Sequence, residues 1–472
     1  MLGKKSKVIL LFLVAALLAA GITIGVTKRP GVRAKDDREY LKMLKEVMTL
    51  VKKNYVEPVD DKKLVESAIN GMLSSLDPHS AYMPPEPFKE MNIQIAGAFG
   101  GVGIELSMKD DRLTVVSPIQ DTPAFRAGIR SGDHIARIDD KWTKGMKIEQ
   151  AVKLMRGKEG TKVTLTIFRE GIAKPFVFPL TRATIHLTSV QYRTLEPGYG
   201  YIKILQFQER SADDFTKALQ TLKDQNKGSL KGLIVDLRYN PGGLVDVAVR
   251  IAGQFVGEGF RSDGTIVSTK GRERSANRTL YASVGEKEPH YPMVVLINGG
   301  SASASEILAG ALQDQKRAVI MGTQSFGKGS VQSILPLKGG AGLKLTTARY
   351  YTPSGRSIQA KGITPDIIVG RVDLAAAKKQ AELPVHEKDL VNHITDGTGV
   401  KDTKPEEKQA EPEKKGNNGK PAQEKSPDAK KPALTGDEEA SKDYQLSRAL
   451  ELLKGVNLVQ TFSSQPVPKQ EK

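Results

Sequence analysis

Three serines stand close together where a helix is expected to begin. The run Asn298-Gly-Gly-Ser-Ala-Ser-Ala-Ser-Glu306 follows an apolar strand, and its glycines permit a tight turn before the helix. A helix N-terminus supplies backbone amides and a positive dipole, which would stabilise the oxyanion formed when Ser303 attacks a carbonyl. Ser303 and Glu306 also fit an ordinary capping box. The run alone therefore leaves a catalytic and a structural interpretation open.

A serine nucleophile needs a general base, and a lysine is the better candidate here. None of the six histidines has a glycine-framed setting; they are His79, His134, His186, His290, His386 and His393. In the run Phe326-Gly-Lys-Gly-Ser-Val-Gln332, glycines flank Lys328 and allow the backbone to place it in a closely packed environment. Burial would lower the pKa of Lys328 and supply a neutral amine near pH 7. Gln332, two strand steps further on, is placed to orient that amine. The alternative interpretation is that Lys328 is an ordinary solvent-exposed lysine in a loop, without a catalytic role.

A second glycine cluster ends another apolar strand and opens another helix. In the run Val235-Asp-Leu-Arg-Tyr-Asn-Pro-Gly-Gly-Leu244, the amide of Gly242 or Gly243 is a candidate oxyanion donor beside the amide of Ala304. Two amides aimed at one oxygen form an oxyanion hole, whose donors each lower a barrier by roughly 3–4 kcal/mol. The alternative is a tight strand-to-helix turn without a catalytic role.

Composition narrows the class of protein. The chain has 472 residues, enough for two or three domains, and no cysteine, which excludes disulfides, thiolate nucleophiles and thiolate metal sites. Its formal net charge of +17 is spread without arginine-rich clusters or interleaved aromatic residues, so we expect no nucleic-acid partner. We also expect no metal and no cofactor.

The N-terminus has the pattern of an export signal. Lysines precede the apolar run Val8–Val26, which is long enough to span a bilayer. We assign residues 1–30 to a signal peptide or a signal anchor and favour the anchor slightly. The expected location is the periplasm or the extracytoplasmic face of the cytoplasmic membrane, with membrane attachment through residues 8–26 if the segment is not cleaved.

The remaining chain divides into five segments by pattern. Apolar residues at helical spacing predict a helical region over 37–90, suited to oligomerisation, and an α/β region over 186–370 alternates apolar strands with helices. Residues 371–436 read as a charged, largely disordered linker, and 437–456 as an amphipathic helix. We expect a homo-oligomer formed through the N- and C-terminal helices. The fifth segment, 95–185, carries its own signature.

Residues 95–185 resemble a PDZ domain. The resemblance rests on the run Pro123-Ala124…Ala127-Gly128-Ile129…Gly132-Asp133 and on the order of the predicted strands and helices. A PDZ domain binds a peptide C-terminus as an added strand, with the carboxylate held by loop amides. The residues that would do so here are Phe99, Gly100, Gly101, Val102, Gly103, Ile104 and Leu106. The alternative is a plain glycine turn before a strand.

Together these motifs resemble the C-terminal processing, or tail-specific, serine proteases. The similarity covers roughly residues 37–370 and extends to the terminal run Asp443-Tyr-Gln-Leu-Ser-Arg-Ala-Leu-Glu-Leu-Leu453. It implies Ser303 as nucleophile, Lys328 as base and Gln332 as the group that orients the lysine. It implies an α/β multidomain protein with a crotonase-like αββ core, an inserted PDZ domain and an N-terminal helical segment.

The expected substrates are envelope proteins with exposed, apolar C-termini, and an accessory regulator is a further expected partner. We expect Arg156, at the end of the PDZ helix, to link peptide capture to the protease; a helix C-cap is its ordinary alternative. Two other functions compete with the protease. One is a catalytically silent PDZ scaffold for envelope proteins, and the other is an acyl-CoA enzyme of crotonase type.

Overall fold

The computed structural model describes residues 34–257, 263–285, 287–370, 385–390, 392–394 and 443–463. The apolar run Val8–Val26 and the low-complexity stretch 401–433 lie outside these residues. Within the described ranges, no helix combines the length and the apolarity that a membrane span requires. The chain forms two compact units, Met1–Met72 and Leu73–Lys472.

The first unit contains two helices that expose much apolar surface. Helix α2 (Ala34–Asn54) is followed by α3 (Asp61–Ser74), which ends in the second unit, and Lys52 forms a 2.7 Å ion pair with Asp61. The exposed apolar side chains of α2 include Leu41, Leu44, Val47 and Leu50. Within the first unit, no described residue covers this face.

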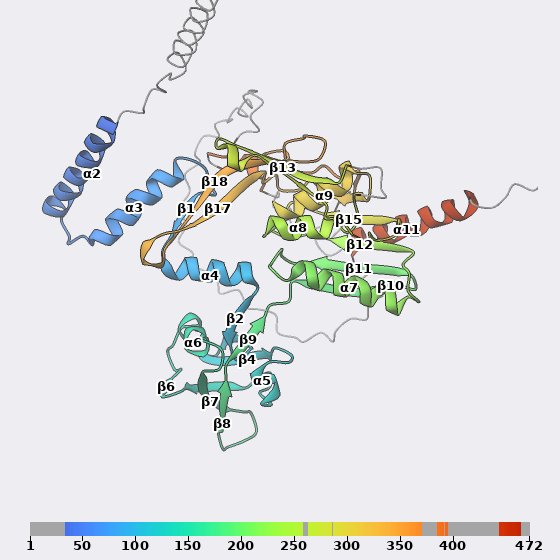
Figure 1. Ribbon diagram of the computed structural model, residues 1–472. Coiled ribbons are helices and arrows are strands. Elements are labelled where there is room, and N and C mark those ends of the chain that lie inside the picture. Colours follow the sequence, from blue (N-terminus) through green and yellow to red (C-terminus); the bar gives the residue numbers. More distant parts are fainter. Residues whose placement is uncertain are drawn as a thin grey trace, which may run out of the picture. The chain divides into compact units, whose positions relative to one another are not determined.

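A mostly parallel sheet organises the second unit (Figure 1). Five of its strands run parallel and β10 is antiparallel at one edge. The order is β10 (Val190–Glu196), β11 (Tyr199–Ile204), β12 (Gly232–Asp236), β15 (Met293–Ile297), β16 (Val319–Gly322) and β19 (Ile367–Ile368). Every residue of β12 and β15 is buried, as expected for continuous apolar strands in a sheet covered on both faces.

Helices cover the two faces of this sheet. Alternate strand residues such as Val235 and Val295 pack against α7 (Ser211–Gln225), α8 (Val245–Ala252) and α9 (Ala304–Asp314). Their neighbours Ile234, Val294 and Leu296 face α11 (Tyr444–Ser463) through Leu446, Ala449 and Leu453. The predicted C-terminal amphipathic helix therefore docks on the body of its own chain.

A second, antiparallel sheet carries the strands that follow the lysine motif. Its long hairpin consists of β17 (Ser330–Pro336) and β18 (Gly342–Tyr351), joined by β13 (Thr265–Gly271) and β14 (Arg278–Tyr281). The short strand β1 (Ala81–Met83) pairs with β18, so that Ala81 lies opposite Lys344. This pairing brings a segment from the N-terminal region beside the hairpin.

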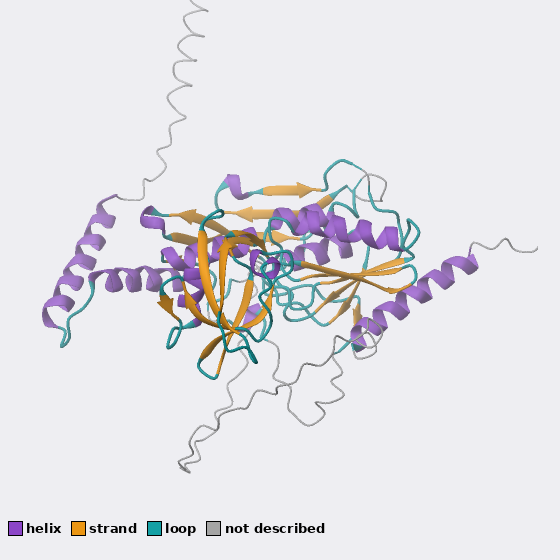
Figure 2. Ribbon diagram, turned by 90° about the horizontal axis from the view of Figure 1, so that it is seen from below, coloured by secondary structure: helices purple, strands orange, loops and turns teal. Residues whose placement is uncertain are grey.

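The PDZ-like segment forms its own small sheet around its own hydrophobic core. Figure 2 draws the strands of the molecule in orange and the helices in purple, as seen from below the view of Figure 1. Two strands, 134–138 and 162–168, flank the helix α6 (Ile148–Met155) in the chain, an order of strands and helix that agrees with the PDZ-like pattern of the sequence. The Gly132-Asp133 motif has a structural reason, because Asp133 is buried and paired with Arg169 at 2.7 Å. The sheet contains β3 (Ile104–Lys109), β4 (Arg112–Pro118), β5 (His134–Ile138), β6 (Lys141–Trp142), β7 (Lys162–Phe168) and β8 (Phe176–Thr181).

Two connections join this small sheet to the rest of the unit. Helix α4 (Pro85–Ala96) leads into β2 (Ala98–Gly101), which pairs with β9 (Ala183–His186). The chain thus enters and leaves the PDZ-like segment through one two-stranded ribbon.

A short segment inside the predicted linker is folded. Residues 385–390 fall within the range 371–436, for which the sequence predicts a largely disordered linker, and they contain a short turn, Glu387–Asp389, with Glu387 fully buried. The turn contacts the body through a backbone hydrogen bond from Glu387 to Phe326. Because the sequence around this segment is rich in charged residues, its composition gives no signal of a folded segment.

We expect α11 to contribute to stability through its buried side chains. Truncating Leu453, which is 1% exposed, to alanine should lower the free energy of unfolding by about 2–5 kcal/mol, because it leaves a cavity against the sheet. Leu458→Ala on the same helix is the matched control, since Leu458 is 59% exposed. Urea unfolding of both variants measures the difference, and equal losses would contradict the docking of α11.

Candidate active site

The turn before α9 is tied to the turn after β12. Asn298 Oδ1 accepts hydrogen bonds from the N–H groups of Gly300 and Tyr239, each at 3.0 Å. Ser301 Oγ donates to the carbonyl of Leu237 at 2.8 Å. Because both turns lie at the carboxyl edge of adjacent parallel strands, the two glycine clusters of the sequence meet there.

Ser303 occupies a strained backbone conformation at the start of α9. Its φ is 55° and its ψ is −112°, values that an L-residue rarely adopts and that cost about 1–3 kcal/mol. The surrounding hydrogen bonds must hold this conformation in place. Strain of this kind is concentrated at functional sites, so the geometry supports the catalytic interpretation beyond a simple helix cap.

The Gly242-Gly243 turn lies directly against Ser303. A side chain at Gly242 would place its Cβ 2.9 Å from Ser303 Cβ and 3.0 Å from the Ala304 nitrogen. At Gly243, whose φ is +140°, the Cβ would come within 2.1 Å of the Phe207 carbonyl. Glycine is therefore required at both positions by close approach.

The two predicted glycine donors are not equivalent. The Gly242 N–H already donates to Asn240 Oδ1 at 2.9 Å. Among the described residues, neither the Gly243 N–H nor the Ala304 N–H has an acceptor. Of the three predicted oxyanion donors, the amides of Gly243 and Ala304 thus lack an acceptor among the described residues, whereas the amide of Gly242 has one.

Glu306 joins the serine and lysine segments. Its side chain is fully buried, and Oε2 accepts the N–H of Ser303 at 2.7 Å and that of Lys328 at 2.9 Å. Its Oε1 accepts the N–H of Gly327 at 2.7 Å and the hydroxyl of Ser325 at 2.6 Å. Since two amides share one oxygen, the backbone nitrogens of Ser303 and Lys328 can be no farther apart than the sum of their two distances to it.

Burial shifts the pKa of both ionisable groups at this centre. Desolvation raises the pKa of Glu306 to about 7, even though the four donors favour its ionised form. The Lys328 side chain is largely buried, and its pKa is lowered by burial and by the nearby charge of Lys344. The shift of Lys328 is in the direction that a general base requires.

Gln332 lies on β17 close to Lys328 in the chain. Its Nε2 donates to Thr346 Oγ1 at 2.8 Å and to Ser330 Oγ at 3.2 Å. Its Oε1 is buried and has no hydrogen-bond partner in the part of the chain that the structure describes. A buried carbonyl oxygen without a donor is a position that a lysine amine could satisfy.

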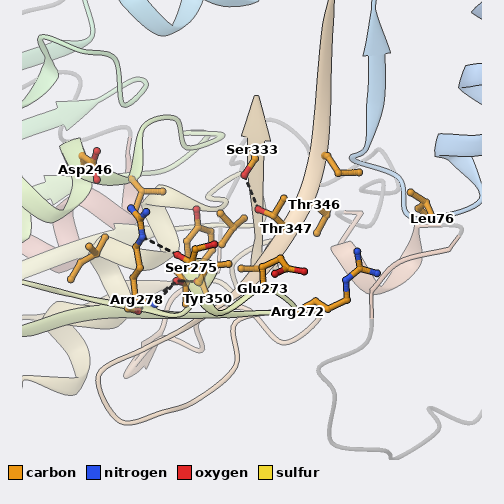
Figure 3. A pocket seen from close by; sticks show the side chains of 17 residues that line it. Leu76, Asp246, Arg272, Glu273, Ser275, Arg278, Ser333, Thr346, Thr347 and Tyr350 are labelled. Carbon is orange, nitrogen blue, oxygen red and sulfur yellow. Dashed lines mark hydrogen bonds between the residues drawn. The ribbon is translucent and has the colours of Figure 1, made fainter. Parts of the chain in front are cut away.

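A cavity of about 810 Å³ lies beside the hairpin (Figure 3). Val245 and Asp246 line it just after the Gly242-Gly243 turn, and Val331 and Ser333 line it just after Lys328. Ala348 and Tyr350 on β18 also line the cavity and add to its apolar wall. The charged residues Arg272, Glu273 and Arg278 line another part of the wall. The cavity therefore adjoins, along the chain, both elements that carry the candidate catalytic groups.

The predicted peptide-binding loop is only partly at the surface. Val102 is 3% exposed and belongs to the core of the PDZ-like sheet, and Ile104 and Leu106 pack partly against that core. Gly100 has a structural need for glycine, because a Cβ there would lie 2.0 Å from the Gly157 carbonyl. The segment predicted as one loop is partly a strand: Phe99, Gly100 and Gly101 lie on β2 and pair with β9, and only Val102 and Gly103, whose φ is +78°, form the loop before β3.

Arg156 joins three elements at one edge of the PDZ-like sheet. It ends α6, its guanidinium lies over the Phe99 ring at 4.6 Å, and its Nη1 donates to both oxygens of Glu90 on α4 at 2.6 and 2.7 Å. Phe99, which lies on β2, is thus connected through Arg156 to the helix that leads into this segment.

Sequence reasoning missed the residues that support the site. Glu306 was visible only as the last position of a capping box, and the contact of its second carboxylate oxygen with Gly327 is long-range. His79 was one of the six histidines without a glycine-framed setting, yet its Nε2 lies 2.7 Å from both oxygens of the buried Glu387. No cluster of metal-ligating side chains occurs within the described ranges.

Three family profiles match the chain. Residues 198–369 match peptidase family S41, residues 100–176 match a PDZ domain, and residues 24–87 match the N-terminal domain of the activating protease CtpB. The S41 match contains Ser303, Lys328 and both oxyanion candidates.

Relatives share most of the chain. A carboxy-terminal-processing protease of Bartonella bacilliformis is 44% identical over 387 residues, which is 82% of this chain and 88% of that protein. The carboxy-terminal processing protease CtpB of Bacillus subtilis is 38% identical, over 70% of this chain and 67% of that protein. A photosystem II D1 C-terminal processing protease structure is 31% identical, covers 69% of this chain and 86% of its own, and has a TM-score of 0.40.

We expect the raised pKa of Glu306 to make stability depend on pH. The pKa is about 7 in the folded chain against an ordinary 4.5, so the folded state binds more protons between these values. The stabilising contribution of the protonated group is complete below pH 4.5 and is lost as pH rises to about 7, with a slope of at most about 1.4 kcal/mol per pH unit.

Glu306→Gln isolates this contribution, because it keeps the shape and removes the titration. The free energy of unfolding of the wild type minus that of the variant, from urea unfolding at several pH values, should fall between pH 4.5 and 7. A flat difference would show that Glu306 has an ordinary pKa in the folded chain.

Proposed function

From the premise that this chain belongs to the carboxy-terminal processing protease family, serine-type peptidases with a PDZ domain, we propose that Ser303 and Lys328 act as nucleophile and general base. The observation that carries the proposal is the shared carboxylate oxygen of Glu306, which binds the backbone of both residues. A serine with a strained backbone, tied to a largely buried lysine whose pKa is lowered, is typical of a catalytic site.

The reaction proceeds through an acyl-enzyme. Neutral Lys328 accepts the hydroxyl proton as Ser303 Oγ attacks the peptide carbonyl carbon, and the oxyanion accepts the N–H groups of Ala304 and Gly243. When the C–N bond breaks, the Lys328 ammonium returns the proton to the departing amine. A water molecule, deprotonated by Lys328, then attacks the acyl carbon, and Ser303 leaves with the proton that Lys328 returns to it.

Gln332 orients the lysine during these transfers. Its Nε2 is fixed by Thr346 and Ser330, which turns the unpartnered Oε1 into an acceptor for the Lys328 amine. An oriented amine keeps its lone pair directed at the serine, so loss of this contact should slow the chemical step more than it weakens substrate binding.

Substrate selection is proposed to begin at the PDZ domain. An exposed, apolar C-terminus of an envelope protein would add beside β3, with its carboxylate at the Phe99–Gly103 loop. The chain would then extend to the cavity next to the hairpin, where Val331, Ala348 and Tyr350 offer an apolar surface. Arg156 would transmit capture to α4 through Glu90.

Location and assembly complete the proposal. The basic, apolar N-terminus favours the periplasm or the extracytoplasmic face of the cytoplasmic membrane, with or without retention of residues 8–26 as an anchor. The exposed apolar residues of α2 favour a homo-oligomer through the N-terminal helices, and a regulator protein is a further expected partner. The parallel sheet flanked by helices favours the crotonase-like αββ description of the core.

The dyad is tested by substituting each member. We expect Ser303→Ala and Lys328→Ala each to lower kcat for an unfolded protein substrate by at least about 10³-fold, because each removes a step of the proton transfer. Lys338→Ala, at an exposed turn of the same hairpin, is the control and should retain activity. Equal cleavage by all the proteins would exclude the mechanism and favour a silent PDZ scaffold.

The coupling role of Arg156 is tested with a peptide activator. Arg156→Ala should change the ratio of cleavage in the presence and absence of a peptide with an apolar C-terminus, since it removes the side chain that contacts both Phe99 and Glu90. Lys153→Ala is the matched control, because Lys153 bonds Glu86 of the same helix α4 at 3.0 Å but both side chains are exposed. If basal and stimulated rates in Arg156→Ala equal those of the wild type, Arg156 has no coupling role.

A further inference from the structure

The segment 385–390 contacts the loop that carries Lys328. The Glu387 N–H donates to the Phe326 carbonyl at 3.0 Å, and His386 Nδ1 lies 3.2 Å from the Ser325 carbonyl. These are the residues immediately before Gly327 and Lys328. A segment more than fifty positions downstream therefore supports the N-terminal side of the lysine loop.

The side chain of Glu387 reaches the other side of the same loop. It is 0% exposed and accepts a hydrogen bond from Gln359 Nε2 at 2.9 Å. Gln359 is also fully buried, and its Oε1 accepts the Gly329 N–H at 3.0 Å. The backbone and side chain of Glu387 thus hold the residues on both sides of Lys328.

A third contact comes from the chain just after α3. His79 Nε2 lies 2.7 Å from both oxygens of Glu387, within hydrogen-bond distance of each. The next residue, Ser80, accepts the Thr346 N–H at 3.1 Å, and Thr346 in turn accepts from Gln332. Residues 79 and 80 therefore contact both the Glu387 segment and the strand that orients Gln332.

Asp77 fixes this short segment. Its carboxylate accepts the N–H groups of His79 and Ser80, each at 2.8 Å, and the hydroxyl of Ser80 at 2.8 Å. Burial acts to raise the pKa of Asp77, but the hydrogen bonds from Ser80 and His79 outweigh it and lower the pKa. Asp77 thus remains ionised and keeps His79 directed at Glu387.

Four charged groups act on the Lys328 ammonium. Lys344 on β18 opposes its charge, whereas Glu387, Glu306 and Asp77 favour it. Glu387 comes first among the three carboxylates in its effect. Removing its negative charge should therefore make the lysine easier to deprotonate.

We propose that Glu387 is a positioning residue for Lys328: with His79 and Gln359 it holds both sides of the lysine loop and balances the charge of the lysine. The inference rests on the proposed role of Lys328 as the general base. A purely structural role for Glu387 would predict a loss of stability without a change in the pH at which activity appears.

The test is the pH dependence of kcat/KM with a chromogenic peptide, measured on the full chain together with its thermal midpoint. Glu387→Gln keeps the shape and removes the charge, so the pH midpoint of the rising limb should fall by about one unit with little change in KM. Lys344→Gln should move the midpoint in the opposite direction, because it removes a repelling charge. Glu387→Ala should also lower kcat at least tenfold, since the loop loses its support.

Asp389→Asn is the matched control, because Asp389 is exposed in the same turn and accepts only the nearby His386 N–H among the described residues. It should leave the pH midpoint of kcat/KM unchanged.

Lys328→Ala separates the hypothesis that Lys328 is the base from the hypothesis that Glu387 positions it: activity in that variant would overturn the proposed base. An inactive Lys328→Ala together with an unmoved midpoint in both Glu387→Gln and Lys344→Gln would overturn the role of Glu387 alone. If Glu387→Gln is too unstable to assay, two other variants test the role of Glu387. We then expect a higher pH midpoint in Lys344→Gln and a lower kcat in His79→Gln. If neither change occurs, the proposed role of Glu387 is overturned.

Discussion

The buried carboxylate of Glu306 is the interaction on which the site depends. Four donors from two segments, the turn at Ser303 and the loop 325–328, converge on its two oxygens, and two of them are the backbone amides of Ser303 and Lys328. A carboxylate buried without these donors would be costly, because a desolvated charge needs hydrogen bonds to remain in a fold. The donors therefore cannot separate without leaving Glu306 unsatisfied, and this requirement fixes the serine turn against the lysine loop.

The same requirement explains why the surrounding backbone is irregular. Ser303 has a strained φ of 55°, and the Gly242-Gly243 turn approaches it so closely that no side chain fits. Parallel strands end side by side at this edge, so the turns that follow them meet without a long connection. The sheet supplies a rigid base, and the hydrogen bonds of Asn240, Asn298 and Glu306 hold the turns in conformations that their sequences would not adopt alone.

The sheet, and the two segments that carry the proposed nucleophile and base, could be predicted from the sequence for physical reasons. Continuous apolar strands such as Met293–Ile297 and glycine-framed polar residues are local signals, and the structure places Ser303 and Lys328 on segments that meet. The selection of Gly243 over Gly242 depends on one side chain, Asn240, that happens to accept the Gly242 amide. Neither spacing nor propensity reveals such a pairing.

Long-range support could not be predicted in the same way. Glu387 lies in a charge-rich range whose composition favours disorder, and its partner His79 is 308 positions away. Buried polar contacts of this kind depend on the whole fold, because a hydrogen bond in water and one in the interior cannot be distinguished from residue types. The inserted PDZ-like sheet, by contrast, was visible because its Gly-Asp turn and strand order are local.

Covalent labelling with a fluorophosphonate, followed by peptide mapping, tests the central claim most directly. The reagent reacts with a serine only when a base activates it and an oxyanion hole receives the phosphoryl oxygen. We expect one adduct, on Ser303, formed at a rate that rises with pH to a midpoint below the ordinary lysine value of 10.5. No adduct, or an adduct on a different serine, would contradict the assignment of Ser303 and Lys328 as the catalytic pair.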